Sequence, residues 1–175
     1  MLFQKSLLTA TLFTAASLTA ISANAATATG SFKVNLTVEK SCVVGATVGT
    51  NDINFGTVSA ATTALTKDAN AAITVACSKT TPYKVALSPT GSSTTGTGDL
   101  IGTGTNTDKI AYALYSNAGA TTVWGNVDGT NTVNGIGAGF GGGTATFTHL
   151  VTAKVLTTDV QPDTYKDTVN VSVIY

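Results

Sequence analysis

Residues that could perform catalysis are few in this chain. It contains one histidine, His149, two cysteines, Cys42 and Cys77, and a single glutamate, Glu39. Catalysis requires a nucleophile beside a base, or several metal ligands brought together. His149 lies in the apolar phase of a strand-like stretch without a carboxylate or a cysteine nearby. We therefore expect His149 to be packed or partly exposed, and we expect no catalytic residue, no metal and no cofactor.

A glycine-rich stretch at residues 137–142 matches the G-x-G-x-x-G pattern of dinucleotide-binding loops. That pattern binds pyrophosphate only where it joins a strand to the N-terminus of a helix. The residues from Thr144 onward alternate as a strand does, and no helical period follows. We interpret the stretch as a flexible glycine-rich loop.

The aspartates show no spacing typical of an EF-hand, although a calcium site built from some of them is an alternative to simple turn capping. Asp in turns accepts hydrogen bonds from backbone N–H groups, and this is the interpretation we favour. The residues concerned are Asp52, Asp99, Asp108, Asp128, Asp159, Asp163 and Asp167.

The overall charge argues against a nucleic-acid partner. Formal net charge is zero, and only 10% of the 175 residues are charged. Phosphate backbones are bound by clustered Lys and Arg, whereas this chain has nine Lys spread along its length and no Arg. One residue in five is Thr, which favours strands, and Gly and Asn are frequent between the apolar stretches.

The first 25 residues have the pattern of a secretory signal. Lys5 supplies a positive charge, residues 7–21 are apolar and rich in Thr and Ala, and Ala23-Asn24-Ala25 is a small-x-small cleavage site. We expect the mature chain to begin at Ala26 and to form one domain of about 150 residues. In an oxidising compartment the even cysteine count predicts a Cys42–Cys77 disulfide, which closes a loop of about 35 residues.

Alternation of apolar and polar residues predicts an all-β fold. The pattern is faultless from Gly30 to Val38, where Phe32, Val34 and Leu36 share one phase. Residues 88–108 are either a mobile loop or contain a short edge strand. Strands separated by Gly, Asn and Pro turns indicate a β-sandwich. Further strands are expected at residues 42–44, 53–55, 71–77, 83–87, 110–115, 144–156 and 167–175.

The two ends of the mature chain are the most informative features. Both are alternating strands, and the last places Val169, Val171, Val173 and Tyr175 in one phase with only Asp167 as a charge. Open sheet edges are normally protected by charge, proline or a cover. An edge without that protection is a site where another chain adds a strand.

The order of the motifs resembles the spore coat protein U domain family. The similarity runs over residues 26–175 and is closest to the major subunit of archaic (Csu-type) chaperone–usher pili. It is carried by Ser41-Cys42, Ile53-Asn54-Phe55-Gly56-Thr57-Val58, Ile73-Thr74-Val75-Ala76-Cys77 with Pro82-Tyr83, Ile110-Ala111-Tyr112-Ala113-Leu114-Tyr115 with Trp124-Gly125, and Pro162-x-x-Tyr165-x-Asp167.

This resemblance implies an incomplete immunoglobulin-like sandwich at residues 40–175 that lacks its last strand. Residues 26–39 would be a donor strand, with Gly30, Phe32, Val34, Leu36 and Val38 facing inward. Val169, Val171, Val173 and Tyr175 would form the acceptor groove and the chaperone-binding edge. The partners implied are a periplasmic chaperone, an outer-membrane usher and neighbouring subunits, in a cell-surface pilus for adhesion and biofilm formation.

Alternatives stay open at this stage. A secreted monomer could bind carbohydrate through Trp124, Tyr112 or Tyr115, although we expect Trp124 in or near the core. A minor subunit of the same pilus would have the same size. A tip adhesin would need a second binding domain, for which about 150 residues leave no room.

Overall fold

The structure is a computed structural model that describes residues 26–68, 73–91, 94–141 and 145–175. The chain divides into two units, residues 1–37 and 38–175, and each is described by itself. The signal segment expected at residues 1–25 lies outside the described residues, and residues 26–37 contain no strand or helix. Among the residues described, no helix is long and apolar enough to cross a membrane.

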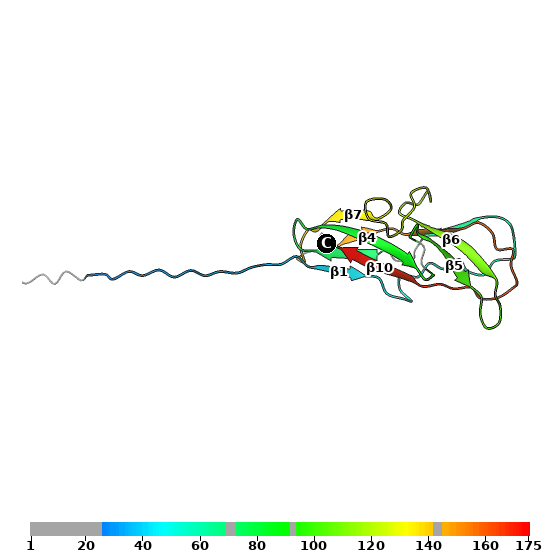
Figure 1. The fold of residues 1–175 in the computed structure, drawn as a ribbon, viewed down its shortest axis with the longest axis horizontal. Coiled ribbons are helices and arrows are strands. Elements are labelled where there is room, and N and C mark those ends of the chain that lie inside the picture. The colour runs from blue at the N-terminus through cyan, green and yellow to red at the C-terminus, as the bar shows by residue number, and fades with distance from the viewer. Residues whose placement is uncertain (1–25, 69–72, 92–93, 142–144) are drawn as a thin grey trace, which may run out of the picture. The chain divides into compact units, whose positions relative to one another are not determined.

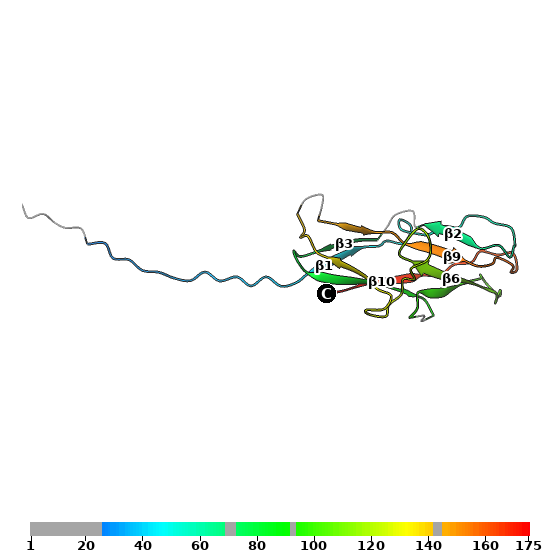
Figure 2. The ribbon, with the colours of Figure 1, turned by 90° about the horizontal axis from the view of Figure 1, so that it is seen from above.

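The second unit is all-β, which confirms the fold class expected from the sequence (Figures 1 and 2). Its described residues form three antiparallel sheets, with the strand orders β1-β3-β8, β10-β4-β7 and β2-β9-β6-β5. The strands are β1 (Cys42–Gly45), β2 (Leu65–Asp68), β3 (Ile73–Cys77), β4 (Pro82–Pro89), β5 (Thr97–Ile101), β6 (Lys109–Tyr115), β7 (Val133–Ile136), β8 (Phe147–His149), β9 (Thr152–Val155) and β10 (Val169–Ile174).

One apolar core joins the sheets. It takes its side chains from β3, β4, β6 and β9 and from the fully buried Trp124. The alternation noted in β3 and β4 places Val75, Val85 and Leu87 inside, as a period of two requires. The indole Nε1 of Trp124 donates a 2.8 Å hydrogen bond to the carbonyl oxygen of Val85 on β4, so its one polar atom is satisfied.

Two strand predictions are wrong. Residues 53–55 form no strand. The single strand expected at residues 144–156 is interrupted at Leu150 and Val151, and β8 pairs with β3 whereas β9 pairs with β6 and β2. The chain changes sheets at this point without losing its alternation, so the sequence pattern alone could not reveal the break. The question left open for residues 88–108 is answered by β5, an edge strand beside β6.

The glycine-rich stretch packs tightly against the turn between β3 and β4. Gly137 N donates to Thr81 O at 2.8 Å, Thr80 N donates to Gly137 O at 2.8 Å, and Gly139 N donates to Cys77 O at 2.9 Å. A Cβ atom on Gly137 would lie 2.3 Å from the carbonyl oxygen of Ser78, so only glycine fits there. The loop is therefore fixed at its start, contrary to our expectation of a flexible loop, and no helix follows it among the described residues.

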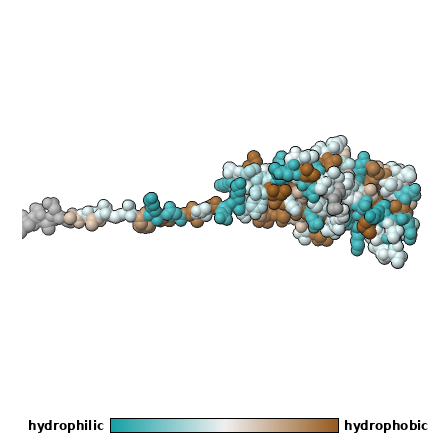
Figure 3. All heavy atoms as spheres, viewed as in Figure 1, coloured by the Kyte–Doolittle hydropathy of each residue, from teal (hydrophilic) through white to brown (hydrophobic). Residues whose placement is uncertain are grey.

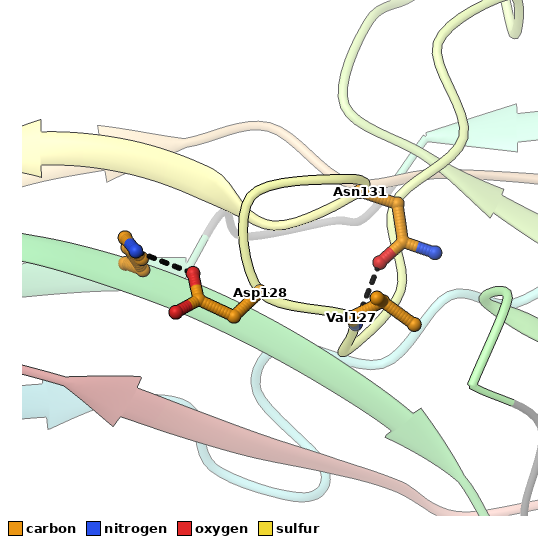
Figure 4. A network of polar contacts seen from close by, with 4 residues as sticks. Val127, Asp128 and Asn131 are labelled. Carbon is orange, nitrogen blue, oxygen red and sulfur yellow. Dashed lines mark hydrogen bonds and ion pairs between the residues drawn. The ribbon is translucent and has the colours of Figure 1, made fainter.

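The loop that precedes β7 is held in a similar way. Val127 N donates a 2.7 Å hydrogen bond to Oδ1 of Asn131, and Asp128 forms an ion pair with Lys84 of β4 (Figure 4). The amide nitrogen of the Asn131 side chain donates to the carbonyl oxygen of Thr94 at 3.0 Å. Asn and Asp side chains thus close the turn, as expected for these residue types.

Candidate functional site

The strand β10 has a hydrogen-bonded partner along one side only. Its six residues pair antiparallel with β4, from Val169 opposite Pro89 to Ile174 opposite Lys84. Within the described residues no strand pairs with its other side. Val169, Val171 and Val173 point toward the core but stay only half-buried. An inward row that is half-buried indicates a core lacking its cover at this edge.

The strand β1 forms a further sheet edge close to β10. In the described part of the chain it pairs only with β3, from Cys42 opposite Cys77 to Gly45 opposite Thr74. Its other side lies close to β10, but the two strands share no ladder. Val43 is 59% exposed. Figure 3 shows apolar side chains gathered around the end of β10 and the adjoining β1.

The two open edges run in opposite directions. The start of β1 lies beside the end of β3, and the end of β10 lies beside the start of β4. A short turn at residues 78–81 joins these parts of β3 and β4, so the beginning of β1 and the end of β10 are at the same end of the sandwich (Figure 1). A strand inserted between the edges would therefore be antiparallel to one of them and parallel to the other.

The predicted disulfide joins Cys42 to Cys77 and fastens β1 to the core strand β3. Cys77 is fully buried and Cys42 is half-buried. Next to the bridge, Ser41 N donates to Ser78 Oγ at 3.0 Å and Ser78 N donates to Ser41 O at 2.9 Å. An edge strand of four residues would otherwise depend on a short ladder, so the bridge keeps this side of the opening in place.

The apolar residues of the N-terminal segment are exposed. Phe32, Val34 and Leu36 in the first unit, and Val38 in the second, are all among the most exposed apolar side chains of the chain. Gly30 belongs to the same phase and is also exposed. The alternation predicted a strand here, but residues 26–41 form none within the subunit. A segment of this pattern needs a partner before its apolar face can be buried.

His149 is a packed residue. Its Nε2 is 3.0 Å from the Tyr83 hydroxyl, and its ring lies edge-on to Trp124 with centroids 6.1 Å apart. Burial lowers the pKa of His149 and raises the pKa of Tyr83. The pair joins β8 to β4, in two different sheets. This geometry supports a structural role for the only histidine.

The aromatic residues proposed for carbohydrate stacking are mostly inaccessible. Trp124 is fully buried and Tyr112 is nearly so, which leaves only Tyr115 partly exposed. Tyr115 lines a shallow, open pocket of about 600 Å³ together with Thr97 of β5 and the threonines of residues 121–122. A single half-buried ring does not form the platform that the alternative required.

The aspartates accept hydrogen bonds from neighbouring loops of the protein. Asp163 accepts hydrogen bonds from Thr103 Oγ1 at 2.5 Å, from Asn106 Nδ2 at 2.8 Å and from Thr103 N at 2.7 Å, and these bonds lower the pKa of its carboxyl. Gly49 N donates to Asp52 at 2.9 Å, and Gln161 N donates to Asp108 at 2.9 Å. In the described part of the chain no three His, Cys, Asp or Glu side chains lie close enough to hold a metal ion.

Reasoning from the sequence missed the contribution of β1 to this opening. Val43 and Val44 were predicted as a short strand, but their exposed position next to β10 was not foreseen. Two adjacent valines point to opposite faces of a strand, so one of them must face outward. That pattern is a weak signal, because it also occurs in strands buried on both faces.

Comparisons with known proteins agree with this architecture. A chain in the crystal structure of the CsuC–CsuE chaperone–tip adhesion subunit pre-assembly complex, from archaic chaperone–usher Csu pili of Acinetobacter baumannii, has a similar fold with a TM-score of 0.53 and 23% identity. The match covers 79% of the present chain and 41% of that chain. No curated protein matches the sequence. The family model of the Spore Coat Protein U domain matches residues 28–172, and the chain therefore belongs to that family.

Proposed function

We propose that this protein is the structural subunit of a chaperone–usher pilus that polymerises by donor-strand exchange. The observation that carries the proposal is the pair of open edges on β1 and β10, which flank half-buried core valines. The exposed alternating segment that contains Phe32, Val34 and Leu36 has the pattern that would fill this opening. The related fold in a chaperone–subunit complex supports the same assembly route.

A donor strand would most favourably run antiparallel to β10. Antiparallel ladders are slightly more stable per residue than parallel ones, and β10 has six residues whereas β1 has four. With Val38 opposite Val169, the pairs Leu36–Val171, Val34–Val173 and Phe32–Tyr175 follow in phase. Val38, Leu36 and Val34 then each meet an inward valine of β10. Phe32 meets Tyr175, which follows the strand and is 54% exposed in the isolated subunit.

The energy of insertion is large on the scale of a subunit interface. Four apolar side chains buried at roughly 1.5–3 kcal/mol each contribute about 6–12 kcal/mol before the cost of ordering the segment. The added ladder satisfies the free backbone groups of both edges. Dissociation would therefore be slow, and the fibre would persist for kinetic reasons.

The proposal includes the partners and the location. A periplasmic chaperone would cover the β10 edge until an outer-membrane usher exchanges it for the next subunit. The head-to-tail contact does not close on itself, so repetition gives an open filament on the cell surface. The role is structural rather than catalytic, and the filament would serve adhesion and biofilm formation. Whether the chain is the major or a minor subunit does not change this mechanism.

The decisive experiment places a charge in the donor segment. Val34→Asp would bring an unpaired carboxylate into the neighbouring core, at a cost of several kcal/mol. The variant should still form a stable complex with its chaperone, because the groove of the same subunit is unchanged. It should then fail to form fibres by electron microscopy.

The matched control is Lys33→Asp. Lys33 is the neighbouring residue in the outward phase, so this variant should polymerise as the wild type does. Normal fibres from Val34→Asp, or the loss of its chaperone complex, would contradict donor-strand exchange. The latter result would mean that the segment is an internal strand of its own subunit.

A further inference from the structure

The connection between the donor segment and the folded unit is very short. Val38 ends the alternating segment and Cys42 begins β1, so only residues 39–41 lie between them. Ser41 is already bound to Ser78 through two hydrogen bonds. An extended chain spans at most roughly 3.3–3.6 Å per residue, so three steps from Val38 to Ser41 reach about 11 Å. Two subunits joined in this way must touch near Ser41.

Two exposed apolar side chains lie at this end of the unit. Ile136 and Phe140, which we name the pole patch, are 64% and 56% exposed. They flank the glycine loop that is bonded to Cys77 and Thr81, and Cys77 is the partner of Cys42. The patch therefore lies close to the point where the chain leads from the donor segment into β1.

The backbone under the patch is rigid. Gly137 and Gly139 are buried, and three backbone hydrogen bonds tie them to residues 77–81. The side chain of Lys79 lies over Gly139, within 3.1 Å of the position of a Cβ atom. Because the backbone is already ordered, less conformational entropy is lost when Ile136 and Phe140 bind a partner. Such side chains are suited to a contact of defined geometry.

We propose that Ile136 and Phe140 bind the neighbouring copy of this chain, the copy whose groove accepts the donor segment of the same subunit. This second contact, which rests on the proposed function, would fix the angle between consecutive subunits. The short connection brings the pole patch against the neighbour, and the exposed apolar pair gains stability when water is excluded from it. In this proposal the glycine loop holds Ile136 and Phe140 in position for the contact between subunits.

Hydroxyl-radical labelling of wild-type fibres tests this proposal without any substitution. The labelling rate of Phe140 in the fibre is compared with its rate in the denatured chain, and Leu156 serves as the control. Leu156 is 64% exposed and follows β9, outside the pole patch. If the patch is buried between subunits, Phe140 should be labelled at least about fivefold more slowly than in the denatured chain, and Leu156 should stay within about twofold.

Equal protection of Phe140 and Leu156, at any level, would overturn the pole contact. The double variant Ile136→Ser with Phe140→Ser adds a second readout, since its fibres should form but bend more readily in electron micrographs. Unchanged bending stiffness would also contradict the proposal. If the wild-type protein forms no fibres at all, the proposed function itself is wrong, and that result is distinct from fibres with an exposed Phe140.

Discussion

The hydroxyl of Tyr112 on β6 donates a 2.7 Å hydrogen bond to Oδ2 of Asp167, two residues before β10 begins. The other carboxylate oxygen of Asp167 accepts from Thr168 N, also at 2.7 Å. Burial and the adjacent Asp167 raise the pKa of Tyr112. Asp167 is the one charge in the strand predicted at residues 167–175, and the structure shows that it ties the start of β10 to β6.

Replacement of this carboxylate should destabilise the protein. Asp167→Ala leaves the buried Tyr112 hydroxyl without its acceptor, at a cost of about 1–3 kcal/mol in the free energy of unfolding. Urea unfolding of fibres, followed by the fluorescence of the single tryptophan, measures the change. Asp128→Ala removes only an exposed ion pair with Lys84 and should stay within about 0.5 kcal/mol of the wild type. Equal effects of the two substitutions would refute the anchoring role.

Stability should fall below about pH 6.5 because of His149. Burial lowers its pKa in the folded state, so the unfolded chain binds the proton more readily. The contribution of His149 to the free energy of unfolding is therefore fully present above its pKa in the unfolded chain. It decreases as the pH falls toward its pKa in the folded protein. Urea unfolding midpoints of the wild type, measured between about pH 7.5 and pH 5.5, should decrease with falling pH. The slope should be weaker in His149→Gln, and parallel curves would show that His149 does not control it.

The disulfide should be required for a stable subunit. The double substitution Cys42→Ser with Cys77→Ser should lower the free energy of unfolding by about 4 kcal/mol, because the closed loop has a sequence separation of 35 residues. Under the proposed function β1 borders the acceptor opening, so the chaperone complex should also be recovered in lower yield. Alkylation of denatured, unreduced fibres followed by mass spectrometry should label neither cysteine, and two labelled thiols would contradict the bridge.

The glycine loop offers a matched pair of substitutions. Gly137→Ala would push a methyl group into the carbonyl oxygens of Ser78 and Cys77, and we expect a loss of about 1–3 kcal/mol. At Gly141 no atom lies within 4 Å of the added Cβ, so Gly141→Ala should leave stability unchanged. Unfolding midpoints of both variants check this difference. A tolerated Gly137→Ala would show that the loop moves easily, which would also weaken the case for the pole patch.

Two of the strands that the sequence predicted correctly, β4 and β6, have one continuously buried face. In β4 and β6 the alternation of Tyr83, Val85 and Leu87, and of Ile110, Tyr112 and Leu114, reflects contact with one core along the whole strand. Such contact is what produces a period of two. The all-β class could be predicted for this reason.

The failures have equally local causes. The two strands that were missed, β2 and β7, have the sequences LTKD and VNGI, in which too few apolar residues occur for a period to be visible. Residues 53–55 alternate, and Ile53 and Phe55 do pack against the core, but without ladder partners. Apolar contact and strand pairing are separate properties, and the sequence pattern reports mainly the first.

For the candidate site, the sequence indicated which residues are unprotected but not what surrounds them. The inward row Val169, Val171 and Val173 was predicted from alternation alone. The neighbouring edge on β1, and the opposite direction of the two strands, depend on how the turn at residues 78–81 reverses the chain from β3 in one sheet to β4 in another. The pairing of β1 with β3, and above all of β10 with β4, joins residues far apart in the chain, and such pairings leave no local signal.

Under the proposed mechanism, the exposed N-terminal segment also affects how long a filament can grow. Lys33 and Lys40 are exposed, and the chain has no Arg, so they are the first sites a trypsin-like protease would meet on a waiting subunit. A cut after either lysine would leave a subunit with an intact groove and no complete donor. Such a subunit would accept a neighbour but could not extend into one, and it would act as a chain terminator. Under the proposed mechanism, the ratio of clipped to intact subunits would set the length distribution of the fibres, as a monofunctional monomer does in a condensation polymer.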